Sequence, residues 1–228
     1  MKRFYKEVSV GEDFSVRLDG RPVKTPKKAV LAFPTRAMAE LVAEEWRAQG
    51  DEIAAATMAQ TKCANTAIDK VAGREGRVAE DLLAYAHDLL CYRAVSPSGL
   101  VARQSAGWDP LIAWAAERFG ARLRTGFGVV PIDQDEATVA ALRRALAAYD
   151  AFALTALHGI AAILGSLVLA LALAEGRLEA DEAFALSRID EDYQAERWGR
   201  DAEAEAGVRD RKAELAALAA FLKLAVRR

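Results

Sequence analysis

Residues that form cross-links and metal sites are scarce in this chain of 228 residues, which has two cysteines and two histidines. Cys63 and Cys91 are too few for a disulfide framework, and both lie among apolar neighbours, so we expect free thiols in a reducing compartment. His87 and Cys91 would share a helix face at i and i+4, but none of the usual ligand spacings of a zinc site occurs. The sequence therefore predicts no metal site and no cofactor, and we expect these residues to be ordinary core residues.

An excess of charge of either sign is also missing. The formal net charge is −2, although 28% of the residues are charged. This balance is typical of an ordinary soluble surface and gives no argument for binding nucleic acid or an anionic membrane. The N-terminal sequence MKRFYKEV has neither an apolar signal region nor a presequence rich in arginine and serine. We therefore expect a cytoplasmic protein.

One long segment, 151–174, lacks formal charge altogether and reads AFALTALHGIAAILGSLVLALALA. A membrane-spanning helix needs roughly 20 consecutive apolar residues, so this segment is either a membrane helix or the central helix of a soluble core. About half of it consists of small or polar residues, and no cluster of lysine or arginine flanks it. We expect one helix that other helices bury on all sides, without membrane insertion. A charge at Ala162 or Gly165 should then unfold it.

The N-terminal part carries strand and turn signals. Asp19-Gly20 is a dipeptide typical of a tight hairpin turn. It follows apolar residues that alternate with polar ones, namely Phe14, Val16 and Leu18. Thr35 can cap a helix that carries Trp46 on its apolar side and that Gly50 closes.

From Gly73 onward the apolar spacing is helical. The pattern predicts one helix that ends near Cys91, a second that opens at Asp109-Pro110 and stops at Gly120, and a third that begins with an Asp133/Glu136 capping box. A fourth runs from Phe184 through Tyr193, and a fifth from Leu215 through Ala225. The predicted fold is therefore α+β and mainly α. A small α+β N-terminal domain (1–71) precedes a larger all-α helical domain (72–228) with a buried central helix.

Positive charge gathers in one predicted loop, RPVKTPKK (21–28). Its cationic side chains are Arg21, Lys24, Lys27 and Lys28. Such a loop could hold a phosphate or an acidic partner, but no glycine-rich turn into a helix N-terminus accompanies it. We therefore expect a solvated loop of an edge hairpin.

The densest polar segment is IDEDYQAERWGRDAEAE (189–205). Asp192 and Glu196 fall on one helical face, and paired carboxylates could perform acid–base chemistry. Without a nearby histidine or glycine loop, a solvated acidic face is the default interpretation. A third is a protein-binding surface, because tyrosine and tryptophan beside charges are typical of interface anchors.

Five segments carry a family resemblance: RFYKEVSV (3–10), LDGRPVKTP (18–26), AEEWRAQG (43–50), ANTAID (64–69) and DEDYQAERWG (190–199). These motifs, and the order in which they occur, resemble those of the assembly chaperones of the F-type ATP synthase catalytic head, specifically the chaperones that act on its α subunit. The resemblance covers nearly the whole chain. It implies a non-enzymatic chaperone with no catalytic residues, which binds the free α subunit and protects its interface until the β subunit replaces it.

The resemblance also supplies candidate functional residues. They are Glu45 and Trp46 in the first helix, and Glu191, Tyr193, Gln194, Glu196 and Trp198 in the acidic segment. Packing of the first domain against the second is an equally good role for Trp46.

The chain starts at the first motif, without the presequence of the organellar, mitochondrial relatives, so we expect a bacterial cytoplasmic protein. The alternative hypothesis is a small-molecule enzyme that uses Asp192 and Glu196 beside the basic loop (21–28), which a cleft joining the two would support.

Overall fold

Helices make up most of the chain, and short strands form two small sheets. The computed structural model describes residues 1–128, 131–199 and 202–226. The strands are β1 (Val8–Val10), β2 (Val16–Leu18), β3 (Arg21–Pro22), β4 (Tyr92–Arg93) and β5 (Gly126–Phe127). The α-helices are α1 (Arg36–Arg47), α2 (Ala59–Thr66), α3 (Glu75–Leu83), α4 (Ser98–Phe119), α5 (Glu136–Leu146), α6 (Ala151–Leu164), α7 (Leu167–Ala174), α8 (Ala180–Ser187), α9 (Ile189–Trp198) and α10 (Ala202–Val226). Short helical turns are η1 (Ala55–Thr57), the π-helical η2 (Ala67–Val71), η3 (Ala84–Ala86) and η4 (Leu89–Cys91). The mainly α, α+β fold class is confirmed.

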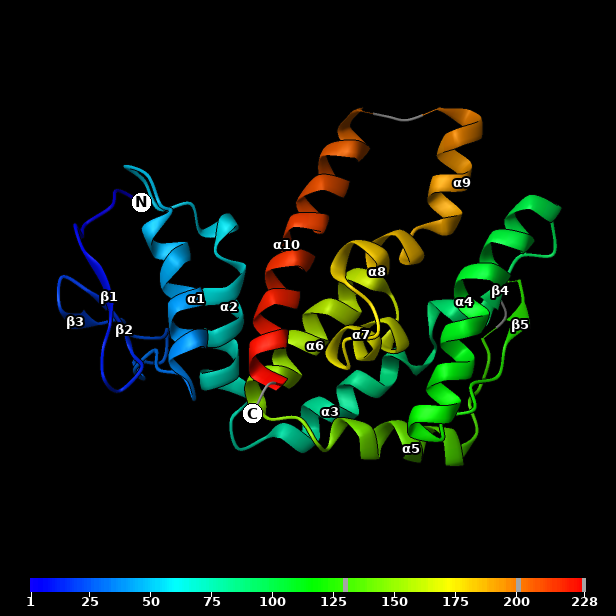
Figure 1. Cartoon of the computed structure of the whole chain (residues 1–228), viewed down its shortest axis with the longest axis horizontal. Helices are drawn as coiled ribbons and strands as arrows, with labels where there is room; N and C mark the ends of the chain where they lie inside the picture. The colour runs from blue at the N-terminus through cyan, green and yellow to red at the C-terminus, as the bar shows by residue number, and fades with distance from the viewer. Residues whose placement is uncertain (129–130, 200–201, 227–228) are drawn as a thin grey trace.

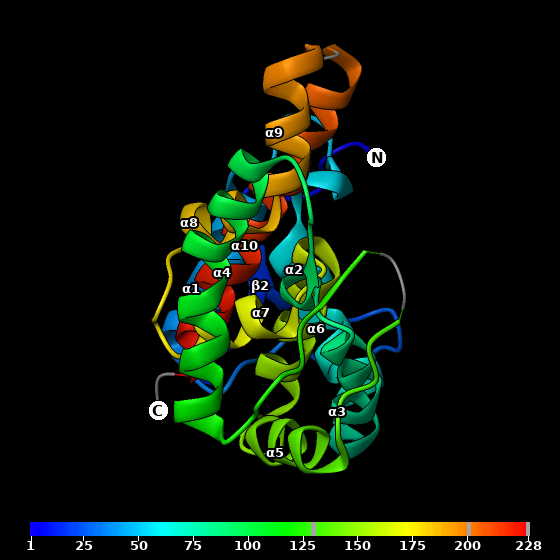
Figure 2. The same cartoon turned by 90° about the vertical axis from the view of Figure 1, so that its right-hand side faces the viewer.

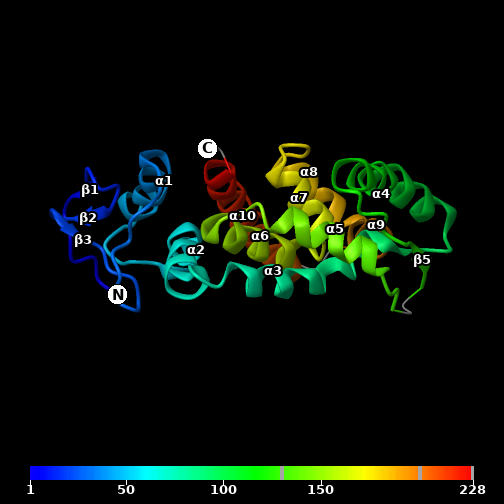
Figure 3. The same cartoon turned by 90° about the horizontal axis from the view of Figure 1, so that it is seen from below.

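The molecule is elongated (Figure 1). Strands β1 to β3 lie at one end and are covered by α1, while β4, β5 and α4 lie at the other end (Figure 1, Figure 3). Helices α6, α7 and α10 lie between the two ends. These central helices separate the N-terminal sheet, which carries the basic loop, from helix α9 (Figure 1).

The expected hairpin is present. Strands β1, β2 and β3 form an antiparallel sheet in that order, and Leu18 pairs with Arg21 across the turn. Asp19 and Gly20 between them have φ angles of 48° and 76°. Both angles lie in the left-handed region that a type I′ turn requires, which explains the Asp-Gly dipeptide. Thr35 also caps α1 as expected, because its side chain accepts a hydrogen bond from Met38 N at 3.3 Å.

The charge-free segment forms two helices, so the expectation of one continuous helix is wrong. Gly165 has φ of 66° and ends α6, and the Ser166 side chain then accepts a hydrogen bond from Leu169 N to cap α7. Nor is α6 buried on all sides, since Ala162 and Gly165 are exposed. A charge at Ala162 is therefore no longer expected to unfold the protein. Within residues 1–128, 131–199 and 202–226, none of the helices combines the length and the hydropathy that a bilayer span requires.

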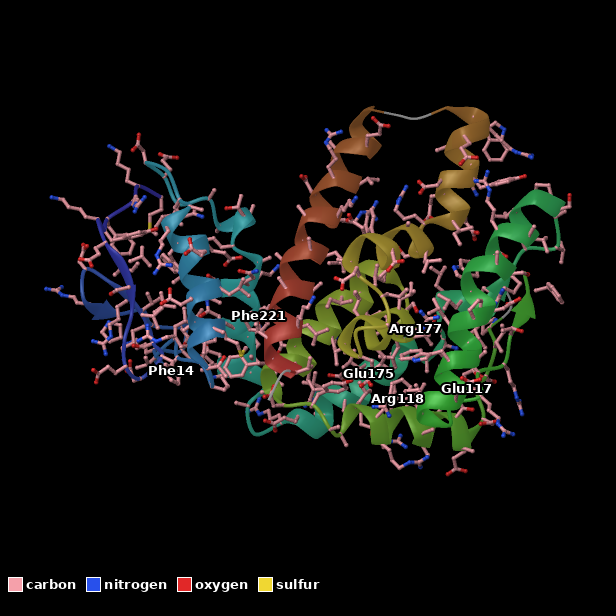
Figure 4. All side chains as sticks on the ribbon, in the orientation of Figure 1. Phe14, Glu117, Arg118, Glu175, Arg177 and Phe221 are labelled. Carbon is pink, nitrogen blue, oxygen red and sulfur yellow. The ribbon has the colours of Figure 1, made fainter. Side chains whose placement is uncertain are left out.

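The packing of α10 on α6 forms the centre of the molecule. A Cβ atom added at Gly159 of α6 would lie 2.8 Å from Leu218 Cδ1 of α10, so glycine permits the close approach. The α10 helix also carries Phe221 (Figure 4). Its ring lies near those of Phe33 and Phe152. One hydrophobic cluster thus connects the N-terminal part with the helical part.

Helix α4 begins earlier than the sequence pattern predicted. It starts at Ser98 and runs through Pro110, so Asp109-Pro110 does not open it, although Gly120 ends it as expected with φ of 76°. The buried residues of α4 recur at helical spacing on both sides of the proline: Leu100, Gln104, Trp108, Leu111 and Ala115. The free energy gained by burying this stripe exceeds the cost of the one backbone hydrogen bond that proline removes.

Helix α3 ends earlier than expected because of a buried carboxylate. It stops at Leu83, and Asp88 Oδ1 then accepts from Leu90 N at 3.0 Å while Oδ2 accepts from Val168 N at 2.9 Å. Asp88 thereby joins this segment to the N-terminus of α7, and burial raises the pKa of its carboxyl group to about 6. His87 and Cys91 consequently share no helix face.

Three further helix boundaries differ from those expected. Asp135, not Asp133, caps α5 and accepts from Thr138 N at 2.7 Å. The single helix expected through Phe184 and Tyr193 is divided at Arg188 into α8 and α9. The last helix also extends well N-terminal of Leu215. In each case the apolar spacing continues across the helix boundary and therefore does not locate it, because side-chain contacts or caps determine where the helix ends.

Candidate functional site

Residues 189–198 of the acidic segment form helix α9, which projects from the body of the molecule beside the N-terminal half of α10 (Figure 1, Figure 2). Residues 200 and 201 of the segment lie outside the described residues. Three acidic residues in its first turn, Asp190, Glu191 and Asp192, favour a helix here because they complement the positive end of the helix dipole. Gly199, with φ of 92°, ends it. Five of the candidate residues therefore lie together on one projecting helix.

One face of α9 is fixed to α4 through Tyr193. This side chain is 6% exposed, and the guanidinium groups of Arg103 and Arg197 lie 5.1 Å and 4.4 Å from its ring centre. Gly99 of α4 admits the ring, because a Cβ atom there would lie 3.2 Å from Tyr193 Oη. Tyr193 therefore positions α9 and is largely hidden from a partner.

Several carboxylates of α9 have partners within the protein. Glu196 binds the Arg103 guanidinium in a fork at 2.8 Å and 2.7 Å, and Asp190 Oδ1 accepts from Gln104 Nε2 at 2.7 Å. Asp192 pairs with Arg188 at 3.2 Å. Asp192 and Glu196 are thus ion-paired with different cations, which does not favour an acid–base pair.

The opposite face of α9 borders a groove of about 960 Å³ against α10. Glu191, Gln194 and Trp198 line it from α9, and Gly207 and Val208 line it from α10. Trp198 is 79% exposed, and within the described part of the chain no cation pairs with Glu191. A large exposed indole beside an unpaired carboxylate is suited to anchoring a protein partner.

Glu45 and Trp46 lie at the other end of the molecule, on α1. The Glu45 carboxylate accepts the N–H groups of Gln60 and Thr61, both at 2.7 Å, and so caps α2. Burial raises the pKa of Glu45, and these hydrogen bonds oppose the shift. Trp46 packs on Tyr5, with ring centres 5.8 Å apart. The structure therefore does not bring these two candidates together with the five on α9.

The geometry does not favour the enzyme hypothesis. The grooves beside the basic loop contain no described residue of α9, and the groove at α9 contains none of the loop. No cluster of three potential metal ligands occurs among residues 1–128, 131–199 and 202–226. The cleft that would join Asp192 and Glu196 to the loop is absent from this described part.

Sequence reasoning missed the partners that hold α9. Arg103 and Gln104 come from α4, some 86 to 93 positions before the residues they bind. No local pattern links such distant positions. The apolar spacing predicts the last helix only from Leu215 onward, so it gives no signal for Val208 and its neighbours on α10.

A family model and three solved structures match this chain. The family model described as ATP12 chaperone protein matches residues 2–116. The crystal structure of Atp12 from Paracoccus denitrificans is 46% identical, with a TM-score of 0.89 and coverage of 98% of each chain. A point mutant of P. denitrificans Atp12p is 45% identical, with a TM-score of 0.90 and coverage of 99% of this chain and 98% of that one. A candidate chaperone from Agrobacterium tumefaciens is 43% identical, with a TM-score of 0.92 and coverage of 97% of this chain and 85% of that one.

Proposed function

This chain belongs to the ATP12 chaperone family, the ATP synthase assembly chaperones that its motifs resemble, and we propose that its client is the free α subunit of the catalytic head. It acts without catalysing a reaction and covers the client's interface until the β subunit replaces it. An unassembled subunit exposes apolar surface that is prone to aggregate, and a reversible cover removes that exposure. Bacterial cytoplasm is part of the proposal, since the solved relatives come from bacteria.

The groove between α9 and α10 is the surface that we propose for client binding. Trp198 is 79% exposed at its edge, and the groove holds about 960 Å³. Tryptophan is enriched among the few residues that dominate binding energy at interfaces, and an indole left this exposed in the free protein gains much from burial. Glu191 and Gln194 beside it supply a polar rim.

Contacts between α4 and one face of α9 hold the other face, which lines the groove, in a fixed position. The contacts of Arg103 with Tyr193 and Glu196 hold α9 in position before a client arrives. A surface that is already ordered loses less entropy on binding than one that must become ordered. We therefore assign Tyr193 and Glu196 to positioning of the helix, and Glu191, Gln194 and Trp198 to contact.

A binding assay with isolated subunits tests the proposal. The purified protein is mixed with unassembled α or β subunit, and co-elution and light scattering of the client are measured. We expect co-elution with α alone and suppression of its aggregation. Trp198→Ala and Glu191→Lys should weaken both effects, whereas Phe127→Ala, which removes another exposed aromatic residue, should not. Equal loss with Phe127→Ala, or no association with α at all, would refute the proposal.

A further inference from the structure

A second groove, remote from α9, lies where the basic loop meets α1 and α2. It holds about 740 Å³. Its apolar lining includes Val23, Trp46, Ile53 and Met58, of which Met58 is buried. We propose that this groove binds an extended segment of a polypeptide in which acidic and apolar side chains alternate. The proposal does not depend on the function assigned to α9.

Positive charge surrounds the apolar lining. Four lysines line the groove, and all are exposed: Lys24, Lys27, Lys62 and Lys70. Within the described part of the chain, no carboxylate forms an ion pair with Lys24, Lys62 or Lys70. Asp69, the acidic residue of the lining, is already occupied, because it accepts from Thr25 Oγ1 at 2.6 Å and from Lys27 N at 2.9 Å. Charge complementarity therefore selects an acidic partner.

Three buried polar atoms of the lining lack hydrogen-bond partners among the described residues, and one of them is the Thr61 hydroxyl oxygen, Oγ1. The other two are Trp46 Nε1 and Asn65 Oδ1. One is a donor and the other an acceptor, and a buried polar group without a partner is costly. A peptide backbone offers both complementary groups in each residue. Small rotations of these two half-buried side chains would let a bound segment supply the missing bonds.

The walls of the groove are held in place by hydrogen bonds. Asp69 ties the loop to η2, and Glu45 ties α1 to the start of α2. The wall that carries Asp69 and Lys70 is a π-helical turn, a feature that is frequent at functional sites. A groove whose walls are already joined needs little ordering when a segment binds.

The groove continues beyond Trp46. Val23, Lys24 and Trp46 also line an adjoining groove of about 590 Å³ that reaches Phe4, which is 64% exposed. An extended chain places successive side chains on opposite sides. A segment with alternating acidic and apolar residues can therefore direct its apolar side chains to the lining and its carboxylates to the exposed lysines.

Three fluorescent peptides of about ten residues test the sequence of the occupant. In one, glutamate alternates with valine; in the second, lysine replaces glutamate; in the third, serine replaces valine. We expect fluorescence anisotropy to show saturable binding of the first peptide that weakens with added salt, and at least about tenfold weaker binding of the other two. Equal binding of the serine peptide, or of an RNA oligonucleotide of the same charge, would overturn the proposal, because either would show attraction of any polyanion.

Matched variants test the location. Lys24→Glu/Lys62→Glu should weaken binding of the glutamate–valine peptide by about tenfold or more, because two attractions become repulsions. Arg122→Glu/Arg144→Glu changes the net charge equally at exposed sites outside the groove and should leave binding within about twofold. Equal losses in the two variants would overturn the proposal.

A third variant tests the unpartnered acceptor. Asn65→Ala removes an oxygen that has no hydrogen-bond partner among the described residues, so thermal stability should hold while peptide affinity falls. Unchanged affinity in this variant would contradict the assigned hydrogen bond. Because these measurements use no α subunit, their failure is separate from failure of the client assay.

Discussion

Phe221 offers a test of whether the N-terminal and helical parts of the molecule fold as one unit. Its side chain is 0% exposed, and its ring centre lies 6.5 Å from that of Phe33 and 6.2 Å from that of Phe152. A buried phenylalanine removes roughly 200 Å² from water, which at about 25 cal/mol per Å² corresponds to about 5 kcal/mol. Phe221→Ala should therefore lower the free energy of unfolding by about 3–5 kcal/mol, the usual range for this change in a core.

Hydrogen exchange followed by mass spectrometry at increasing urea concentration separates the two parts, because peptides from β2 and from α6 are measured in the same sample. We expect one unfolding midpoint for both peptides, shifted to lower urea by about 1–2 M in Phe221→Ala. Phe127→Ala, at a side chain that is 70% exposed, should shift neither peptide measurably. If the β2 midpoint stays in place while the α6 midpoint falls, the two parts unfold separately and the reasoning is wrong.

Three further predictions follow from particular residues. Because burial raises the pKa of Asp88 from 3.8 to about 6, its contribution to stability is fully present below pH 4 and is lost as the pH rises through 6. The free energy of unfolding of the wild type minus that of Asp88→Asn should therefore fall by about 2 kcal/mol between pH 4 and pH 7, and a rise would contradict this. Gly165→Ala should cost about 1 kcal/mol, since Gly165 has φ of 66°, whereas the exposed Ala162→Glu should change thermal stability little; the reverse order would show that α6 is misplaced. Trp198→Ala should leave the melting temperature within about 2 °C of wild type while weakening client binding, and a large drop would make the indole structural.

Local signals predicted the parts of the fold that local chemistry decides. Asp19-Gly20 makes the predicted turn, Thr35 caps the predicted helix, and Gly120 ends α4. Each depends on the backbone freedom or the side-chain oxygen of one residue, which the sequence displays directly. The fold class followed from these signals together with the helical spacing of apolar residues.

The wrong predictions arise where contacts between residues far apart in the sequence determine the structure. The charge-free segment has the length of one helix, yet Gly165 and Ser166 divide it, and Asp88 binds the N-terminus of the second half from 80 positions away. The same holds at α9, where Arg103 binds Glu196 across the fold. The family motifs located the candidate residues, but only the structure separates Tyr193, which is buried, from Trp198, which is exposed.

Cross-linking with mass spectrometry on a mixture of this protein and isolated α subunit identifies the partner and the contact surface in one experiment. We expect cross-links to the client that concentrate on the described residues of α9 and the N-terminal half of α10, and that become fewer in Trp198→Ala. Cross-links that avoid α9, or that form equally with the β subunit, would contradict this expectation.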